Sequence, residues 1–171
     1  MKILALVGPS SSGKSLTLKY LIEIFGQKLQ SANPGTPVFY PATSGRCTRY
    51  VDGARWGAFL TRLRQEEQQM HKTIQDAFTM FDWNGKKIGI FTIGDARRYL
   101  EEKFKTLETC DIIVCPTHEK CNMLKFLFGK CSVDLWFVKK EKIDSTWQTQ
   151  IPQNKSIASD LFQRVEALTH L

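Results

Sequence analysis

The chain has 171 residues, 24 Lys+Arg against 17 Asp+Glu, a formal charge of +7 at pH 7, and 42% hydrophobic residues. That length suits one domain with its own core, and the aromatic content of 11% argues against disorder. No run approaches the roughly 20 apolar residues that a membrane helix needs. We therefore expect a single soluble domain over residues 1–171, whose moderate positive charge favours an anionic ligand such as a nucleotide or a nucleic acid.

Cysteine usage predicts a reducing compartment. The chain has five cysteines, an odd number, and it is too long to need disulfides for its stability. Residues 1–7 resemble the start of a signal peptide, but the apolar run stops after five residues. We therefore expect a cytoplasmic protein.

The elements expected in the first half begin with a buried strand over residues 3–7, where the apolar run is continuous. A helix follows over residues 15–30, with leucine, isoleucine and phenylalanine at helical spacing, and the breakers of 31–35 end it. The next two elements are a short strand over 38–40 and a helix over 57–76.

The second half is expected to begin with a hairpin. Asn84-Gly85 separates two apolar arms, and both residues tolerate the positive φ of a tight turn. Further strands are predicted over 88–93, 111–115 (ended by Pro116) and 133–138, and helices over 96–104, 119–128 and 157–168. This alternation predicts an α/β fold of three layers, α/β/α, with a mainly parallel sheet and one antiparallel hairpin strand.

The segment between the first strand and the first helix matches the pattern G-x-x-x-x-G-K-[ST] at every fixed position. Glycines let successive backbone N–H groups point inward at an anion, and the following helix adds its positive end. In such a loop Lys14 would bridge the β- and γ-phosphates, and Ser15 would give its hydroxyl to Mg²⁺. The predicted nucleotide-binding residues are Gly8, Pro9, Ser10, Ser11, Ser12, Gly13, Lys14, Ser15 and Leu16.

On this motif and its strand–helix context, the chain resembles the P-loop NTPase superfamily. The resemblance implies ATP or GTP with Mg²⁺, bound at the carboxyl ends of a parallel sheet. It also implies an acidic residue at the end of another buried strand, which would hold the metal shell. Asp95 follows the strand over 88–93 and is favoured for this role, although it could simply cap the next helix. Asp111 begins its strand and Asp82 lies beside the hairpin, so both are expected at the wrong edge, and Thr92 is expected to be structural.

ATP is the expected nucleotide. The Asn-Lys-x-Asp element with which P-loop GTPases read guanine is absent, and so is their Asp-x-x-Gly switch. The Gly-Pro-Ser start of the loop is similar to that of nucleotide kinases, especially the guanylate kinase group, with Thr48-Arg49 in the place of an acceptor-binding segment. Against a kinase, no arginine occurs between Arg98 and Arg164, where such enzymes draw phosphate-clamping residues from a lid.

Basic residues gather between positions 46 and 64. A solvated face is the first interpretation of this stretch, and a nucleic-acid patch or an arginine finger is the alternative. Tyr50 and Trp56 could stack on a base or close a small satellite core. Arg97 and Arg98 lie beside Asp95 and are slightly better finger candidates. The arginines of the stretch are Arg46, Arg49, Arg55, Arg62 and Arg64.

Cys115, His118, Cys121 and Cys131 carry residue types that bind zinc, but their spacing follows none of the usual templates. A buried free cysteine is expected instead at Cys115, and His118 is expected in a loop near the nucleotide.

The sequence thus predicts an ATP–Mg²⁺-binding NTPase, with Lys14 and Asp95 as catalytic groups and Ser15 and Asp95 as metal ligands. No water-positioning glutamate follows Asp95, so turnover is expected to be slow, or to need a protein partner or self-association. A nucleotide or small-molecule kinase and a non-catalytic interaction module remain open.

Overall fold

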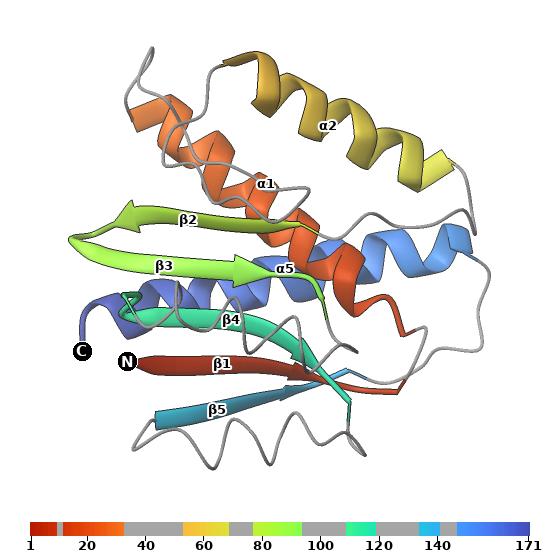
Figure 1. Cartoon of the computed structure of the whole chain (residues 1–171). Coiled ribbons are helices and arrows are strands. Elements are labelled where there is room, and N and C mark those ends of the chain that lie inside the picture. Colours follow the sequence, from red (N-terminus) through yellow and green to blue (C-terminus); the bar gives the residue numbers. More distant parts are fainter. Residues whose placement is uncertain (10–11, 33–52, 69–76, 94–108, 119–133, 141–146) are drawn as a thin grey trace.

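A computed structural model describes residues 1–9, 12–32, 53–68, 77–93, 109–118, 134–140 and 147–171, and the description below is confined to them. These residues form a five-stranded sheet and three helices (Figure 1). The α/β class, with a mainly parallel sheet and one antiparallel pair, is confirmed. The elements are β1 (Lys2–Val7), α1 (Lys14–Ala32), α2 (Gly53–Gln68), β2 (Phe78–Trp83), β3 (Lys86–Phe91), β4 (Ile112–Thr117), β5 (Asp134–Lys139) and α5 (Trp147–Thr169).

The strands lie in the order β2-β3-β4-β1-β5, so the first strand of the chain has β4 on one side and β5 on the other. It is parallel to both, and its register runs from Lys2 opposite Ile112 and Asp134 to Val7 opposite Thr117 and Lys139. β3 is parallel to β4. The carboxyl ends of these four strands therefore share one edge of the sheet, the edge from which the chain enters α1 (Figure 1).

The predicted hairpin is confirmed. β2 and β3 pair antiparallel from Phe78 opposite Phe91 to Trp83 opposite Lys86. Asn84 and Gly85 make the turn with φ angles of 50° and 72°, the backbone that a two-residue turn of this kind needs. The hairpin lies at the amino-end edge of the parallel strands.

Two predicted boundaries are wrong, and in each case the observed element contains a proline. β4 continues through Pro116 to Thr117, opposite β1. Its pairing with β3 ends earlier, at Ile90 opposite Val114, so the missing N–H of Pro116 falls where the described strand has one neighbour. The last helix begins at Trp147 instead of residue 157 and contains Pro152 on its exposed side.

Several expected elements fall outside the described residues. They are the strand over 38–40, the helices over 96–104 and 119–128, and the part of the 57–76 helix beyond residue 68.

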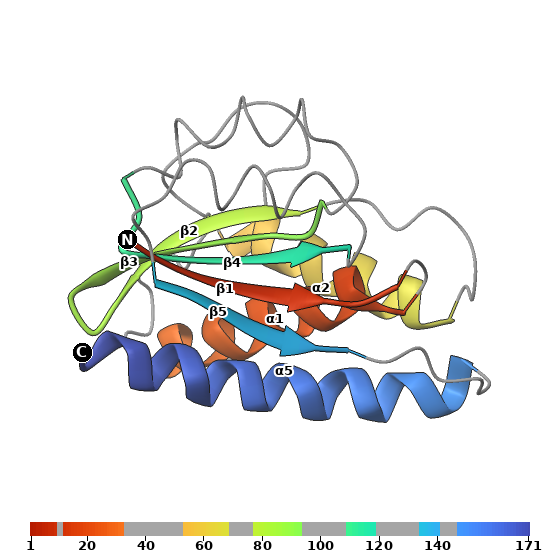
Figure 2. The ribbon, with the colours of Figure 1, turned by 90° about the horizontal axis from the view of Figure 1, so that it is seen from below.

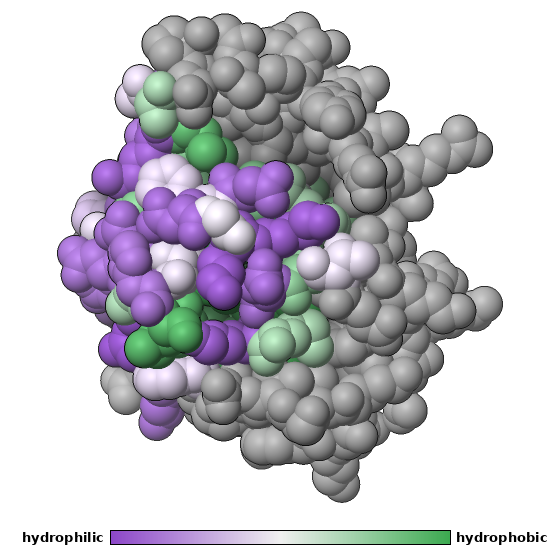
Figure 3. Space-filling view, turned by 90° about the vertical axis from the view of Figure 1, so that its left-hand side faces the viewer, coloured by the Kyte–Doolittle hydropathy of each residue, from purple (hydrophilic) through white to green (hydrophobic). Residues whose placement is uncertain are grey.

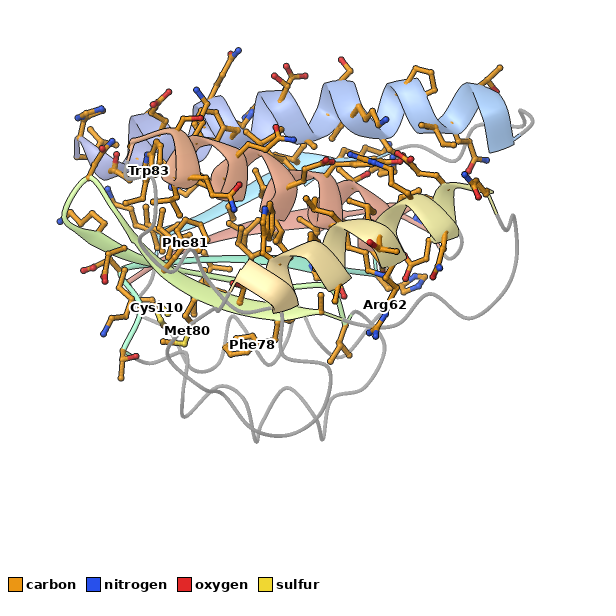
Figure 4. All side chains as sticks on the ribbon, turned by 90° about the horizontal axis from the view of Figure 1, so that it is seen from above. Arg62, Phe78, Met80, Phe81, Trp83 and Cys110 are labelled. Atoms are coloured by element: carbon orange, nitrogen blue, oxygen red, sulfur yellow. The ribbon has the colours of Figure 1, made fainter. Side chains whose placement is uncertain are left out.

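The core lies between the sheet and the pair α1 and α5, which run side by side on one face of it (Figures 1 and 2). Phe25 of α1 is fully buried at its centre, with its ring 4.6 Å from that of Phe81, 5.4 Å from Trp83 and 4.8 Å from Phe162 of α5. Figure 4 shows Phe81 and Trp83 pointing from β2 toward these helices, while Phe78 and Met80 point away from them. This alternation follows from the two-residue period of a strand.

α2 is attached to α1 by a ring contact and by charged groups. Trp56, which is buried, lies against Gly26 and stacks on Phe59 with the ring centroids 5.4 Å apart. Of the two interpretations left open for Trp56, the structure supports a role in packing, but within the main hydrophobic core and not in a separate satellite. Lys19 donates to both carboxylate oxygens of Glu66, at 2.7 and 2.6 Å.

Glu67 is the second charged attachment. Its Oε1 accepts hydrogen bonds from the Tyr20 hydroxyl at 2.8 Å and from Arg64 at 2.9 Å, and it pairs with Lys155 of α5 at 3.0 Å. Arg64 also pairs with Glu23. Arg64 is therefore ion-paired as well as partly exposed, so the solvated-face prediction holds for it only in part, whereas Arg62 is exposed as expected (Figure 4).

We expect Glu67→Gln to lower the free energy of unfolding by about 1–2 kcal/mol at pH 7. This is at the low end for hydrogen bonds to a charged group, because the side chains of Arg64 and Lys155 are nearly half exposed. Burial works against the charge of Glu67, but hydrogen bonds from Lys155 and Tyr20 and the charge of Arg64 leave its pKa below the ordinary 4.5. A lowered pKa stabilises the fold above 4.5, and this contribution is lost as the pH falls through the folded-state value. Urea unfolding at pH 7 and at acidic pH should show the difference shrinking in acid; an equal difference at both would contradict this.

None of the helices within the described ranges is both long and apolar enough to span a bilayer. Figure 3 shows the side of the molecule with the hairpin and both termini, where the described residues are mainly hydrophilic. Buried polar groups gather instead at the opposite edge, where the parallel strands end.

Candidate functional site at the carboxyl edge of the sheet

The candidate site is the loop between β1 and α1. Gly8 and Pro9 follow β1 directly, and α1 begins at Lys14. Gly8 is held to the neighbouring strand because its N–H donates to the carbonyl oxygen of Thr117, at 3.2 Å. The predicted order of buried strand, loop and helix is present, although Ser10 and Ser11 lie outside the described residues.

The two glycines of the motif are required for different reasons. Gly13 has a φ of 80°, a backbone conformation that residues with a side chain rarely adopt. The chain passes directly from this residue into α1. Gly8 is needed for space, because a Cβ at this position would lie 2.3 Å from the carbonyl oxygen of Lys140. The Ser12 hydroxyl would be 3.2 Å from the same Cβ.

Lys14 lies across the start of the loop. Its ammonium donates to the carbonyl oxygens of Gly8 at 2.8 Å and Pro9 at 2.6 Å, and the residue is only 7% exposed. These two bonds hold a buried positive charge at the start of the loop, and an anionic ligand is what such a charge suits.

Ser15 faces the end of β3. Its hydroxyl donates to the carbonyl oxygen of Thr92 at 2.9 Å. The Thr92 side chain is structural, as expected, since its hydroxyl oxygen accepts from the N–H of Ala77 at 2.7 Å. The loop is thus joined to the strand whose next residues lead to Asp95, which itself lies outside the described part of the chain.

Three buried polar atoms at this edge have no hydrogen-bond partner among the described residues. They are the hydroxyl of Ser12, the hydroxyl of Thr117 at the end of β4, and the side-chain Nδ2 of Asn154 on α5, while atoms of Thr79, Trp83 and Gln153 are in the same position elsewhere. An unpaired buried polar group costs free energy, about 1–3 kcal/mol, unless a ligand or water satisfies it. Hydroxyls and an amide N–H are donors that phosphate oxygens accept, so these groups fit a polyphosphate.

Lys140, which the sequence analysis did not single out, is the other basic residue of the site. It directly follows β5, its N–H donates to the carbonyl oxygen of Val7 at 2.6 Å, and its side chain is bonded to Oδ1 of Asn154. Burial first, and then the positive charge of Lys14, lower the pKa of Lys140 to about 8. Asp95 was favoured as an acidic residue after a strand; a basic residue in the equivalent place after β5 is the signal that points to Lys140, but its position beside the loop depends on the pairing of β5 with β1.

The acidic residues expected at the wrong edge are confirmed there. Asp111 precedes β4, and its carboxylate accepts from the N–H of Lys87 at 2.8 Å. Asp82 pairs with Lys87 across the hairpin and is exposed.

Other predicted site residues are only partly described. Arg46, Arg49, Tyr50, Arg97 and Arg98 lie outside the described residues, and so does the side chain of Arg55. Leu16 is fully buried in the core and so belongs to the helix packing.

The zinc interpretation finds no support in the described residues. Cys115 is fully buried within β4, and burial raises the pKa of its thiol to about 12, whereas zinc binds the thiolate. His118 follows the end of the same strand, as expected. Cys121 and Cys131 lie outside the described ranges, within which no group of three metal-ligating side chains occurs.

Comparison with known proteins gives no relative: no family model, no curated protein and no solved structure matches the chain. The function is therefore argued from the loop and its surroundings alone.

Proposed function

We propose that the chain binds ATP with Mg²⁺ in the loop over residues 8–16 and hydrolyses it slowly, as a P-loop NTPase. The observation that carries the proposal is the tethered ammonium of Lys14, buried over a glycine loop at the carboxyl edge of a parallel sheet. Open α/β sheets bind their ligands at this edge, next to the strand where the order of connection reverses. Here that strand is β1, because β4 and β5 lie on opposite sides of it.

The residues present fit the triphosphate. Lys14 would bind its negative charge, and the N-terminus of α1 would add unpaired N–H groups and the positive end of the helix. The unpartnered hydroxyls of Ser12 and Thr117 would donate to phosphate oxygens. Bound phosphate would thus satisfy groups that are otherwise buried at a cost.

The same edge of the sheet carries oxygen ligands of the types that bind a magnesium ion. Ser15 would supply its hydroxyl, and Asp95 is the carboxylate that follows β3. When bound, Mg²⁺ would neutralise charge on the phosphates. The chain's own part is to hold the phosphates in place with Lys14 and to keep Ser15 oriented toward the end of β3. Because no glutamate stands directly after Asp95 to orient a water, hydrolysis is expected to be slow.

Lys14→Ala is expected to weaken Mg–ATP binding by about 100-fold and to abolish phosphate release, because charge-assisted bonds to phosphate contribute about 1.5–3 kcal/mol each. Calorimetric titration with Mg–ATP and a phosphate-release assay measure the two effects. Lys86→Ala is the matched control, since it removes a lysine at the hairpin edge of the sheet.

Equal affinity in wild type and Lys14→Ala would exclude this loop as the site. Absence of any binding of ATP or GTP to the wild type would remove the proposal altogether. ADP formation only in the presence of an added nucleotide acceptor would replace hydrolysis by phosphoryl transfer.

A further inference from the structure

Lys140 lies against the start of the loop through its backbone. Its N–H bonds to Val7, and its carbonyl oxygen comes so near Gly8 that a Cβ there would be 2.3 Å away. Lys140 has a long, charged side chain, yet the residue is only 2% exposed. Burial of a lysine to this degree is costly unless its charge is compensated.

The hydrogen-bond partner that the described residues give the Lys140 ammonium carries no charge. The ammonium bonds to Oδ1 of Asn154, an uncharged amide, and the charged group whose field acts on Lys140 is Lys14, which is also positive. Two ammonium groups thus lie at one loop, and the positive charge of Lys14 disfavours the charge of Lys140. A polyanion is a ligand that would compensate the buried charge of Lys140.

Asn154 adds a donor at the same place. Because its Oδ1 accepts from Lys140, its Nδ2 must point the other way, and an amide nitrogen can only donate. Nδ2 has no hydrogen-bond partner among the residues that the structure describes, although Asn154 is 1% exposed, and it lies 2.9 Å from where a Cβ on Gly13 would be. A buried unpaired donor beside the second glycine of the loop is a second, independent indication of an acceptor-rich ligand.

We propose that Lys140 is a second cation for the polyphosphate, binding it opposite Lys14, and that Asn154 is the positioning residue that holds Lys140 at the loop. The inference rests on the proposed function and deepens it. Lys140 directly follows β5 and Asn154 lies on α5, so the bound phosphates would be held by three parts of the chain and not by the loop alone.

Lys140→Met tests the assignment, because methionine keeps the apolar length and removes the charge. Affinity for Mg–ATP should fall about 10- to 100-fold, as for a lost charge-assisted bond. The melting temperature without ligand should stay unchanged or rise, because a buried uncompensated charge is removed. Lys139→Met, at the exposed neighbouring position, is the matched control and should change neither quantity.

A pH measurement gives a second readout. The pKa of Lys140 is about 8, and a bound polyanion would raise it, so wild type should take up a proton on binding near pH 8–9. Calorimetry in two buffers of different ionisation enthalpy measures this uptake, which Lys140→Met should lack. Within the described ranges, the charged group that acts on Lys140 is Lys14, and Asn154 does not titrate.

Unchanged affinity in Lys140→Met would overturn the assignment. A fall in melting temperature together with the fall in affinity would also overturn it, because that combination would mean that Lys140 stabilises the fold and does not bind the ligand. If wild type binds no Mg–ATP, the proposed function fails first; if wild type binds and Lys140→Met binds equally, only the present inference fails.

Discussion

Gly8→Ala is expected to abolish Mg–ATP binding and to lower the free energy of unfolding by about 1–3 kcal/mol. The added Cβ would lie 2.3 Å from the carbonyl oxygen of Lys140 and 3.3 Å from its carbonyl carbon. Both are backbone atoms, and the same residue is tied to β1 by the bond from its N–H to Val7. Relief of the clash must therefore displace either the end of β5 or the loop itself, and both hold the proposed phosphate site.

The matched control is Gly57→Ala. Gly57 lies exposed in α2, and a Cβ there would meet nothing within 4 Å. Alanine in a helix is favoured over glycine by up to about 1 kcal/mol, so this variant should be slightly more stable and should bind as wild type does. Urea unfolding and titration with Mg–ATP measure both variants. Wild-type affinity in Gly8→Ala would show that the close approach of Lys140 does not shape the site.

The loop was predictable because its information is local. Gly8, Gly13, Lys14 and Ser15 fall within eight consecutive residues between an apolar run and a helical pattern, and no tertiary contact is needed to recognise them. The hairpin at Asn84-Gly85 was predictable for the same reason, since positive φ selects for those residue types.

The other half of the site was not predictable in this way. Lys140 reaches the loop only because β5 pairs beside β1, and this order of strands is a tertiary property. Asn154 is placed by the packing of α5 on α1, and its part of the chain was not expected to be helical at all. Both elements with misplaced boundaries contain a proline, a residue that usually ends an element. In β4 the missing N–H of the proline lies where it costs little, and in α5 the packing of the helix outweighs it.

Phe25→Ala is expected to give the largest loss of stability, about 3–5 kcal/mol, because truncation of a buried phenylalanine removes its transfer free energy and leaves a cavity. Phe25 is fully buried, and its ring contacts the rings of Phe81, Trp83 and Phe162, so α1, β2 and α5 all border the cavity. The three remaining aromatic rings are too rigid to fill it completely. Leu171→Ala, at a position 79% exposed, is the control and should change the free energy of unfolding by less than about 0.5 kcal/mol.

The same variant separates stability from binding. Phe25 lies about three turns along α1 from Lys14, so the loop in the folded molecule should keep its geometry. Mg–ATP at a fixed concentration should then raise the free energy of unfolding by the same amount in Phe25→Ala and in wild type, because the increment depends only on affinity for the folded state. A smaller increment in the variant would mean that the aromatic cluster also positions the first turn of α1. A loss of stability below about 1 kcal/mol would mean that the cluster collapses into the cavity more readily than its packing implies.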